Sequence, residues 1–435
     1  MAIMATINNE LWRKDAPPVH ELSSLELPVL RKENLPNGIP LYILNQGETA
    51  VCRLGIFIRG GCSESDTPSV ASLAASLMRE GSVRYPAENL ADLFERNGAW
   101  IDTAAHNHYT AIHVYSLNNR FNEVLPGVAD MIINPEFSDD VFEIFRENKA
   151  RSLETDMCKV AVIASRESDR IFYGKDHPMG RIEHPDNIRD INVDEIRGFH
   201  SVRCNASDIT LFLTGKIDEE AIKTVSAGFG SIMNDRKPYS LSIMLPEGKW
   251  DKDVQTFNLL AANQAAVKMT IPAISRANDD YEMLRVAVCG LGGYFGSRLN
   301  TNIREEKGLT YGITSSIIGI DGFGAINISC QCDERYVDTV IREIRYELDR
   351  MKSGDYTDDE IARLKRFYMT SLSGILESPF SVMDFYESSF IADIPSDYFA
   401  QQLRALENLS PAMLREIASK YFHHDEALTV VVGKS

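Results

Sequence analysis

The chain has 435 residues, of which 44% are hydrophobic and 25% are charged, a composition typical of a soluble globular protein. Its formal net charge of -18 disfavours contact with the phosphate backbone of a nucleic acid. No stretch approaches the roughly 18 consecutive apolar residues that would cross a bilayer. We therefore expect neither a nucleic-acid-binding protein nor a membrane protein.

The amino terminus bears on the cellular compartment, and the cysteines bear on disulfides and metals. Residues 1–18 carry Glu10, Arg13, Lys14 and Asp15 and no apolar run of the kind found in secretory signals. The 7 cysteines are an odd number without a CxxC pair, which favours free thiols over disulfides or a metal cluster. The missing signal predicts a cytoplasmic protein.

The two halves of the chain run through the same series of predicted elements. The first half gives a strand, two helices, a strand pattern, two helices and a last strand, at residues 50–59, 68–78, 87–97, 100–116, 122–133, 139–155 and 209–215. The second half gives a strand, a region of two helices, strands, two helices and a last strand, at residues 264–271, 279–303, 310–332, 334–352, 357–376 and 428–433.

Matching details make a duplication the simplest interpretation of this series. The long helices at Asp139 and Asp358 both begin with two aspartates after a hydroxyl residue, and Thr357 with Glu360 has the spacing of a capping box. We predict two copies of one α+β domain, at residues 1–235 and 254–435, joined by a polar linker at residues 236–253. Chance alternation of helices and strands is the alternative. Two such domains would enclose a cleft between them.

The segment from Leu291 to Tyr311, LGGYFGSRLNTNIREEKGLTY, is the sharpest local feature. Its glycines permit tight turns or a close backbone approach, and Gly308 is placed to end a short helix before a strand. The glycines do not have the spacing of a phosphate-binding loop, so a nucleotide site is excluded.

This segment resembles the second-domain signature of the M16 metallopeptidases, the family of insulinase and the mitochondrial processing peptidase, and the resemblance covers nearly the whole chain. It implies two homologous domains, each an antiparallel sheet packed with helices, facing across a cleft. It also implies that Arg304 and Tyr311 hold a peptide substrate, for which a guanidinium and a phenol are suitable donors. The alternative is that Arg304 pairs with Glu305 or Glu306 and Tyr311 is a core residue.

The zinc motif of the family, H-x-x-E-H on a helix, is degenerate in this chain. Matching the surrounding sequence position by position places Ser72 and Ser76 where the family has its two histidine ligands, and Ala75 where it has the catalytic glutamate. A serine hydroxyl is a poor zinc ligand, and an alanine cannot transfer a proton. Glu154 matches the third ligand, with Glu147 one heptad earlier, but we expect it to be an ordinary helix carboxylate paired with Lys149 or Arg151.

A relocated metal site is the alternative that the histidines leave open. His106 and His108 lie two apart in the predicted strand pattern and would share one face, where Glu154 could join them. His113 lies an odd number of residues away and would point to the other face.

The resemblance implies a non-catalytic subunit that binds peptide. In short M16 pairs one chain can supply H-x-x-E-H and the other the arginine and tyrosine, so we expect no cofactor in this chain, zinc in a paralogous partner, and a heterodimer in which Arg304 and Tyr311 complete the partner's site. Two other functions are weighed beside it: a scaffolding homodimer like the core subunits of respiratory complexes, and an autonomous metallopeptidase that uses His106 and His108.

Overall fold

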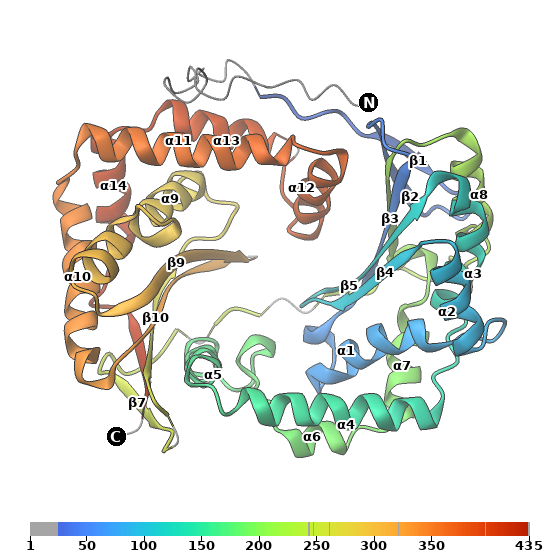
Figure 1. The fold of residues 1–435 in the computed structure, drawn as a ribbon, viewed down its shortest axis with the longest axis horizontal. Coiled ribbons are helices and arrows are strands. Elements are labelled where there is room, and N and C mark those ends of the chain that lie inside the picture. The colour runs from blue at the N-terminus through green and yellow to red at the C-terminus, as the bar shows by residue number, and fades with distance from the viewer. Residues whose placement is uncertain are drawn as a thin grey trace, which may run out of the picture.

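The computed structural model describes residues 25–433, except residues 242, 243, 247, 261, 321 and 396 and the side chain of residue 320. Residues 1–18, on which the cytoplasmic expectation rests, lie outside this part of the chain, so that expectation stays a prediction. The described chain forms two sheets with helices outside each, arranged around a central opening (Figure 1). Within the described residues, no helix combines the length and apolar composition needed to span a bilayer.

The first sheet has six strands in the order β1-β2-β6-β3-β5-β4. Its strands are β1 (Arg31–Asn34), β2 (Pro40–Asn45), β3 (Val51–Arg59), β4 (Trp100–Ala105), β5 (Tyr109–Leu117) and β6 (Ile209–Gly215). All neighbouring strands are antiparallel except β2 and β6, which run parallel. The sheet is therefore mixed, whereas the sequence predicts an antiparallel sheet. The parallel pair forms because β6 returns to the sheet after a long excursion through helices.

The second sheet repeats this plan with five strands in the order β7-β11-β8-β10-β9. Its strands are β7 (Gln255–Asn258), β8 (Ala265–Ala273), β9 (Thr310–Ile320), β10 (Phe323–Cys332) and β11 (Leu428–Gly433). Again one pair, β7 and β11, is parallel and the others are antiparallel. Strand β9 lies at the edge of this sheet, as β4 does in the first.

The helices follow the same division. The first half carries α1 (Pro68–Leu77), α2 (Ala87–Arg96), α3 (Phe121–Ile133), α4 (Asp139–Asp156), α5 (Val160–Tyr173), α6 (Pro185–Arg189), α7 (Val193–Arg203) and α8 (Glu219–Phe229). The second half carries α9 (Tyr281–Val288), α10 (Val337–Ser353), α11 (Asp358–Ile375), α12 (Pro379–Ile391), α13 (Tyr398–Glu407) and α14 (Pro411–Tyr421). The predicted elements are confirmed to within a few residues, and Thr357 caps α11 by accepting from the Glu360 N–H at 3.2 Å.

Each half also lends one helix to the sheet of the other half, which the sequence did not predict. Helix α12 lies on the inner face of the first sheet, where Val382 and Met383 join a core with Phe57 and Phe212. Helix α5 lies on the inner face of the second sheet, where Val160 and Phe172 belong to a core with strand residues of β8, β10 and β11. Figure 1 shows both helices beside the central opening. The exchange buries inner faces that neither half covers alone.

Each exchanged helix forms an ion pair with a buried cation on a central strand of the sheet that it covers. Arg53 of β3 is 1% exposed and forms ion pairs with Glu387, at 3.0 Å, and Asp384 of α12. His113 of β5 faces the same helix, with its Nε2 3.1 Å from Glu387 Oε2. In the second half, Lys268 of β8 pairs with Asp169 of α5 at 3.0 Å. Both interactions join residues of different halves.

Replacement of Glu387 should loosen the contact between the halves. Glu387→Ala leaves the Arg53 guanidinium buried beside only the exposed Asp384, and loss of one member of a buried pair costs about 3–5 kcal/mol of unfolding free energy. Urea unfolding monitored by tryptophan fluorescence measures this cost. Glu123→Ala, which removes one partner of the exposed Arg120–Glu123 pair, is the matched control and should cost about 0–1 kcal/mol. Equal midpoints for the two variants would contradict the assignment.

Candidate functional site

The degenerate zinc-motif positions lie on α1, and their side chains are satisfied by the helix itself. The Ser72 hydroxyl donates to the Ser69 carbonyl at 3.1 Å, and the Ser76 hydroxyl donates to the Ser72 carbonyl at 3.0 Å. Ala75 is 1% exposed and belongs to the core of the first half. Such bonds to the preceding turn are ordinary for serine in a helix. These three positions therefore offer neither a metal ligand nor a general base.

The carboxylates of α4 are engaged in ion pairs. Glu154 lies 2.7 Å from Arg189 of α6, and Glu147 lies 3.1 Å from the same guanidinium and 2.8 Å from Arg151. Hydrogen bonds from Arg189 and Arg151 lower the pKa of Glu147. Glu154 is thus an ion-paired helix carboxylate as expected, although its partner is Arg189 instead of Lys149 or Arg151. The residues present do not fit the zinc site of H-x-x-E-H peptidases.

The structure corrects the expectation for His106 and His108, which lie in the turn between β4 and β5 and not on a strand. The turn packs on the loop after β3 through its backbone, with the Cys62 N–H donating to the His106 carbonyl at 2.8 Å. Gly61 permits this approach, since a Cβ there would lie 2.0 Å from the same oxygen. The ring of His108 is 2.7 Å from Glu64. No group of three potential metal ligands occurs anywhere in the described chain.

The signature segment, residues 291–311, departs from regular helix. Two stretches adopt π-helical hydrogen bonding, η6 (Cys289–Gly293) and η7 (Asn300–Glu306). The second of the two helices predicted for this region is therefore a π-helical stretch. Gly292 lets η6 lie against β9, because a Cβ there would be 2.8 Å from the Ser315 nitrogen. Such π-helical stretches are rare and frequently occur at functional sites.

Buried hydrogen bonds attach η7 and the end of α9 to the strand β9. The Asn300 amide donates to the Ile313 carbonyl of β9 at 2.9 Å, and the Ser315 hydroxyl donates to the Val288 carbonyl at 2.6 Å. The Leu309 N–H donates to the Ile303 carbonyl at 3.0 Å and closes the turn before β9. The positions of Arg304 and Tyr311 therefore depend on one connected piece of backbone.

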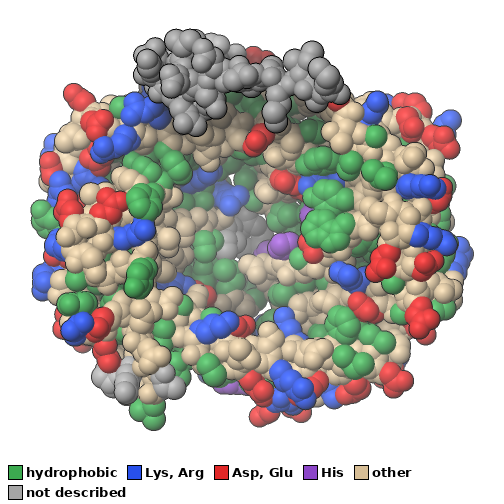
Figure 2. Space-filling view, viewed as in Figure 1, with side chains coloured by type: hydrophobic (Ala, Val, Ile, Leu, Met, Phe, Trp, Pro, Cys, Tyr) green, Lys and Arg blue, Asp and Glu red, His purple; other side chains and the backbone are tan. Residues whose placement is uncertain are grey.

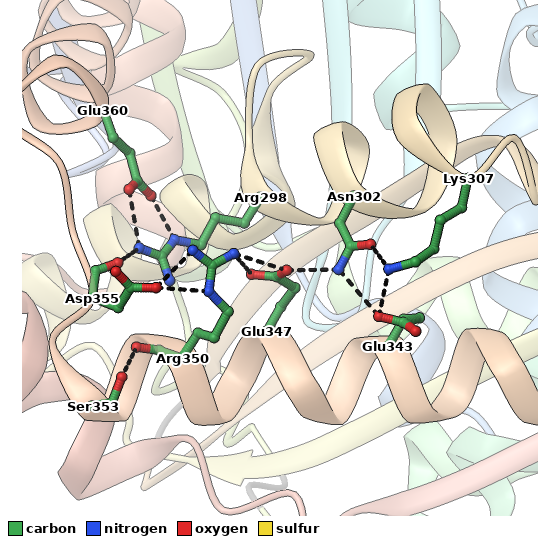
Figure 3. Close-up of polar contacts among 9 residues, drawn as sticks. All are labelled: Arg298, Asn302, Lys307, Glu343, Glu347, Arg350, Ser353, Asp355 and Glu360. Atoms are coloured by element: carbon green, nitrogen blue, oxygen red, sulfur yellow. Dashed lines mark hydrogen bonds and ion pairs between the residues drawn. The ribbon is translucent and has the colours of Figure 1, made fainter.

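A chain of polar contacts, which we call the α10 network, fixes the other side of this segment to α10 (Figure 3). At its centre the Asn302 amide donates to Glu347 Oε1 at 2.6 Å, and Glu347 is 1% exposed. Lys307 pairs with Glu343 at 2.8 Å, and Arg298 pairs with Glu360. The network consists of Arg298, Asn302, Lys307, Glu343, Glu347, Arg350, Asp355 and Glu360.

The network shifts the pKa values of its outer carboxylates. The hydrogen bond from Lys307 lowers the pKa of Glu343, and the hydrogen bond from Arg350 lowers that of Asp355. A carboxyl whose pKa falls on folding stabilises the fold at neutral pH and loses that contribution as the pH falls through its lowered pKa. The attachment of the signature segment to α10 should therefore weaken in acid.

Arg304 and Tyr311, which we call the clamp pair, stay outside this network. The Arg304 guanidinium lies 4.2 Å from the centre of the exposed Phe295 ring, and no described carboxylate lies within ion-pair distance of it. Tyr311 is 91% exposed at the start of β9. Arg304 therefore does not pair with Glu305 or Glu306, and Tyr311 is not a core residue. The structure keeps both side chains available at the surface of the second half.

The clamp pair and the degenerate motif belong to different halves of the chain, and α1 and β9 lie on opposite sides of the central opening (Figure 1). The space-filling view shows a hollow between the halves at this place (Figure 2). The supporting residues Asn302, Glu347 and Lys268 were not found from the sequence. For Lys268 a signal exists, because it is a lone charge in the apolar strand β8.

Both halves match models of one protein family. Residues 42–166 match the model described as insulinase (peptidase family M16), and residues 190–368 match the model described as the peptidase M16 inactive domain. The chain is 23% identical over 362 residues to an uncharacterized zinc protease of Bacillus subtilis, YmxG, a match that covers 82% of this chain and 86% of that one.

Solved structures share the fold over almost the whole chain. A peptidase M16 inactive domain from Pseudomonas fluorescens matches with a TM-score of 0.84 and 19% identity, covering 93% of this chain and 98% of that chain. A protease from Helicobacter pylori matches with a TM-score of 0.85 and 16% identity, covering 94% and 100%. At these identities the likeness concerns the fold alone.

The α10 network predicts a specific rescue. Asn302→Asp places a carboxylate against the buried Glu347, which should destabilise the protein by at least about 2 kcal/mol and speed amide exchange in residues 298–309. Adding Glu347→Gln restores a donor opposite the new carboxylate and should return exchange towards the rate of the unsubstituted protein. Hydrogen–deuterium exchange with mass spectrometry measures both effects. Glu305→Gln, on the exposed side of η7, is the control. Unchanged exchange in the Asn302→Asp variant would refute the role of the network.

Proposed function

This chain belongs to peptidase family M16, and we propose that it is a non-catalytic, peptide-binding subunit whose clamp pair completes the active site of a zinc-bearing M16 partner. The fold and the family are those of M16 peptidases. The division of labour between two chains is our proposal, and its two parts have separate support.

The first part, the absence of catalysis by this chain alone, is supported by the chemistry of α1. Zinc peptidases of this type need two imidazoles and a carboxylate on one helix. Here those positions are Ser72, Ala75 and Ser76, and both serine hydroxyls donate hydrogen bonds to carbonyls of the same helix. Glu154, the remaining candidate ligand, is ion-paired with Arg189. These side chains fit a helix that folds without a bound metal.

The second part, peptide binding, rests on one observation: Arg304 and Tyr311 do little for the fold of this chain. A partly buried arginine that lies near carboxylates commonly pairs with one, and a tyrosine normally buries its ring. Tyr311 instead leaves 91% of its surface exposed, and Arg304 rests only on the Phe295 ring although Glu305 and Glu306 follow it directly. A guanidinium and a phenol held in this way can donate to the carbonyls or carboxylates of a peptide.

The alternatives receive less support. A scaffolding homodimer would gain nothing from an unpaired guanidinium and an exposed phenol beside the hollow. An autonomous metallopeptidase based on His106 and His108 would need a third ligand, whereas in the described chain His108 is paired with Glu64 and no three-ligand group forms. We therefore favour the subunit.

Elemental analysis tests the first part. Tag-free protein should contain zinc below about a tenth of an equivalent and should not hydrolyse peptides, because α1 offers no imidazole. The same preparation should be dialysed against zinc before a second measurement. About one equivalent of zinc, lost when His106 or His108 is replaced, would show that the metal site has moved and that this chain is a peptidase itself.

Replacement of Arg304 tests the second part. In a pair reconstituted with an M16 chain of the same organism that carries H-x-x-E-H, Arg304→Ala should lower kcat/KM for peptide hydrolysis at least tenfold, since a lost charge-assisted hydrogen bond costs about 1.5–3 kcal/mol. Arg342→Ala, an exposed arginine of α10, removes the same charge away from the hollow and serves as the control. Equal activity of the two variants would rule out the clamp role.

A further inference from the structure

A cavity of about 630 Å³ lies where α5 meets β8, β9 and β10, and Tyr311 is one of its lining residues. Its wall comes from both halves of the chain, with Ala164 and Ser165 supplied by the exchanged helix α5. Ligand pockets in proteins have volumes of about 300–1,000 Å³. The space beside Tyr311 is therefore large enough for side chains of a bound peptide.

The side chains that line this cavity differ in charge from the protein as a whole. The chain has a formal net charge of -18, yet among the described residues that line the cavity Lys268 alone is charged, and no carboxylate is among them. A wall without carboxylates around one ammonium favours a ligand with negative charge.

One N–H bond of the Lys268 ammonium remains available to such a ligand. Lys268 is 9% exposed, and its Nζ donates to Ser165 Oγ and to Asp169 Oδ1, each at 3.0 Å. An ammonium has three N–H bonds, and within the described chain the third has no acceptor. Because Asp169 does not line the cavity, the carboxylate that balances Lys268 lies outside the space that a ligand would occupy.

The remaining polar wall is neutral. Thr314 of β9 stands opposite Ser329 of β10 in the register of the two strands, and Gln264 and Gln331 also line the cavity. In the part of the chain that the structure describes, these four side chains make no hydrogen bond. Hydroxyl and amide donors beside an ammonium can bind both oxygens of a carboxylate.

We infer that this cavity is a subsite for an acidic side chain, glutamate or aspartate, of the peptide that the clamp pair holds. The inference rests on the proposed function and names the substrate class: peptides with an acidic residue next to the segment held by Arg304 and Tyr311. The free carboxyl terminus of a peptide has the same chemistry, so the test uses peptides with an amidated terminus.

Two sets of fluorescein-labelled, amidated twelve-residue peptides provide the probe, with glutamate or glutamine fixed at the centre and degenerate flanks free of acidic residues. Fluorescence anisotropy with the full-length chain should show about tenfold tighter binding of the glutamate set, the effect of one charge-assisted hydrogen bond in a partly open site. Lys268→Met should reduce the ratio to about one. Lys420→Met, which removes an exposed lysine of α14, should keep it.

The outcomes separate this inference from the proposed function. Equal binding of both sets, with both weakened by Arg304→Ala, would overturn the acidic subsite and leave the clamp pair standing. Binding of neither set would overturn both. Because Lys268 also pairs with Asp169, its variant is checked by thermal unfolding, and Ser329→Leu, which fills the cavity and keeps the lysine, gives a second test. It should abolish the preference for glutamate, and a retained tenfold preference would overturn the inference.

Discussion

The guanidinium of Arg53 is buried in the first sheet, but the carboxylates that balance it belong to α12 of the second half. Since an unpaired buried charge is strongly destabilising, the first half depends on the second for its electrostatic balance. Lys268 and Asp169 repeat the arrangement in the other direction, with strand and helix exchanged between the halves. The duplicated chain is therefore one folding unit, although its two sheets are built from separate parts of the sequence.

The exchange also determines which surfaces remain open. Helix α5 lies over β8 and β11, and α12 lies over β6 in the first sheet, so the edge strands β9 and β4 lie beyond the exchanged helices. Tyr311 stands on one of these edges and Trp100 on the other, and both are largely exposed. The hollow between the halves (Figure 2) is therefore left open because the exchanged helices do not extend to these edges.

Local signals predicted most of the helices and strands, since hydrophobic periodicity and caps act over a few residues. The sequence alone also indicates that Ser72 and Ser76 stand at the family's histidine positions and Ala75 at that of its catalytic glutamate. The exchange of α5 and α12 could not, because an apolar helix face does not reveal which sheet covers it. The sequence pattern predicts a strand at His106 and His108, because Tyr109 and Thr110 continue the β pattern, whereas the structure has a turn there. The partner of Glu154, Arg189, lies in a separate helix, beyond the reach of helical spacing.

The two parts of the site differ in how the chain stabilises them. On α1 the former ligand positions carry side chains that the helix itself satisfies, so nothing around them maintains a metal site. Around the signature segment the opposite holds: the α10 network encloses the buried carboxylate of Glu347 and ties Arg298, Asn302 and Lys307 to neighbouring helices (Figure 3). Arg304, in the middle of that segment, is left unpaired. The buried charged groups of the α10 network, which are costly to bury, therefore hold the backbone of this segment while the Arg304 side chain stays without a carboxylate partner.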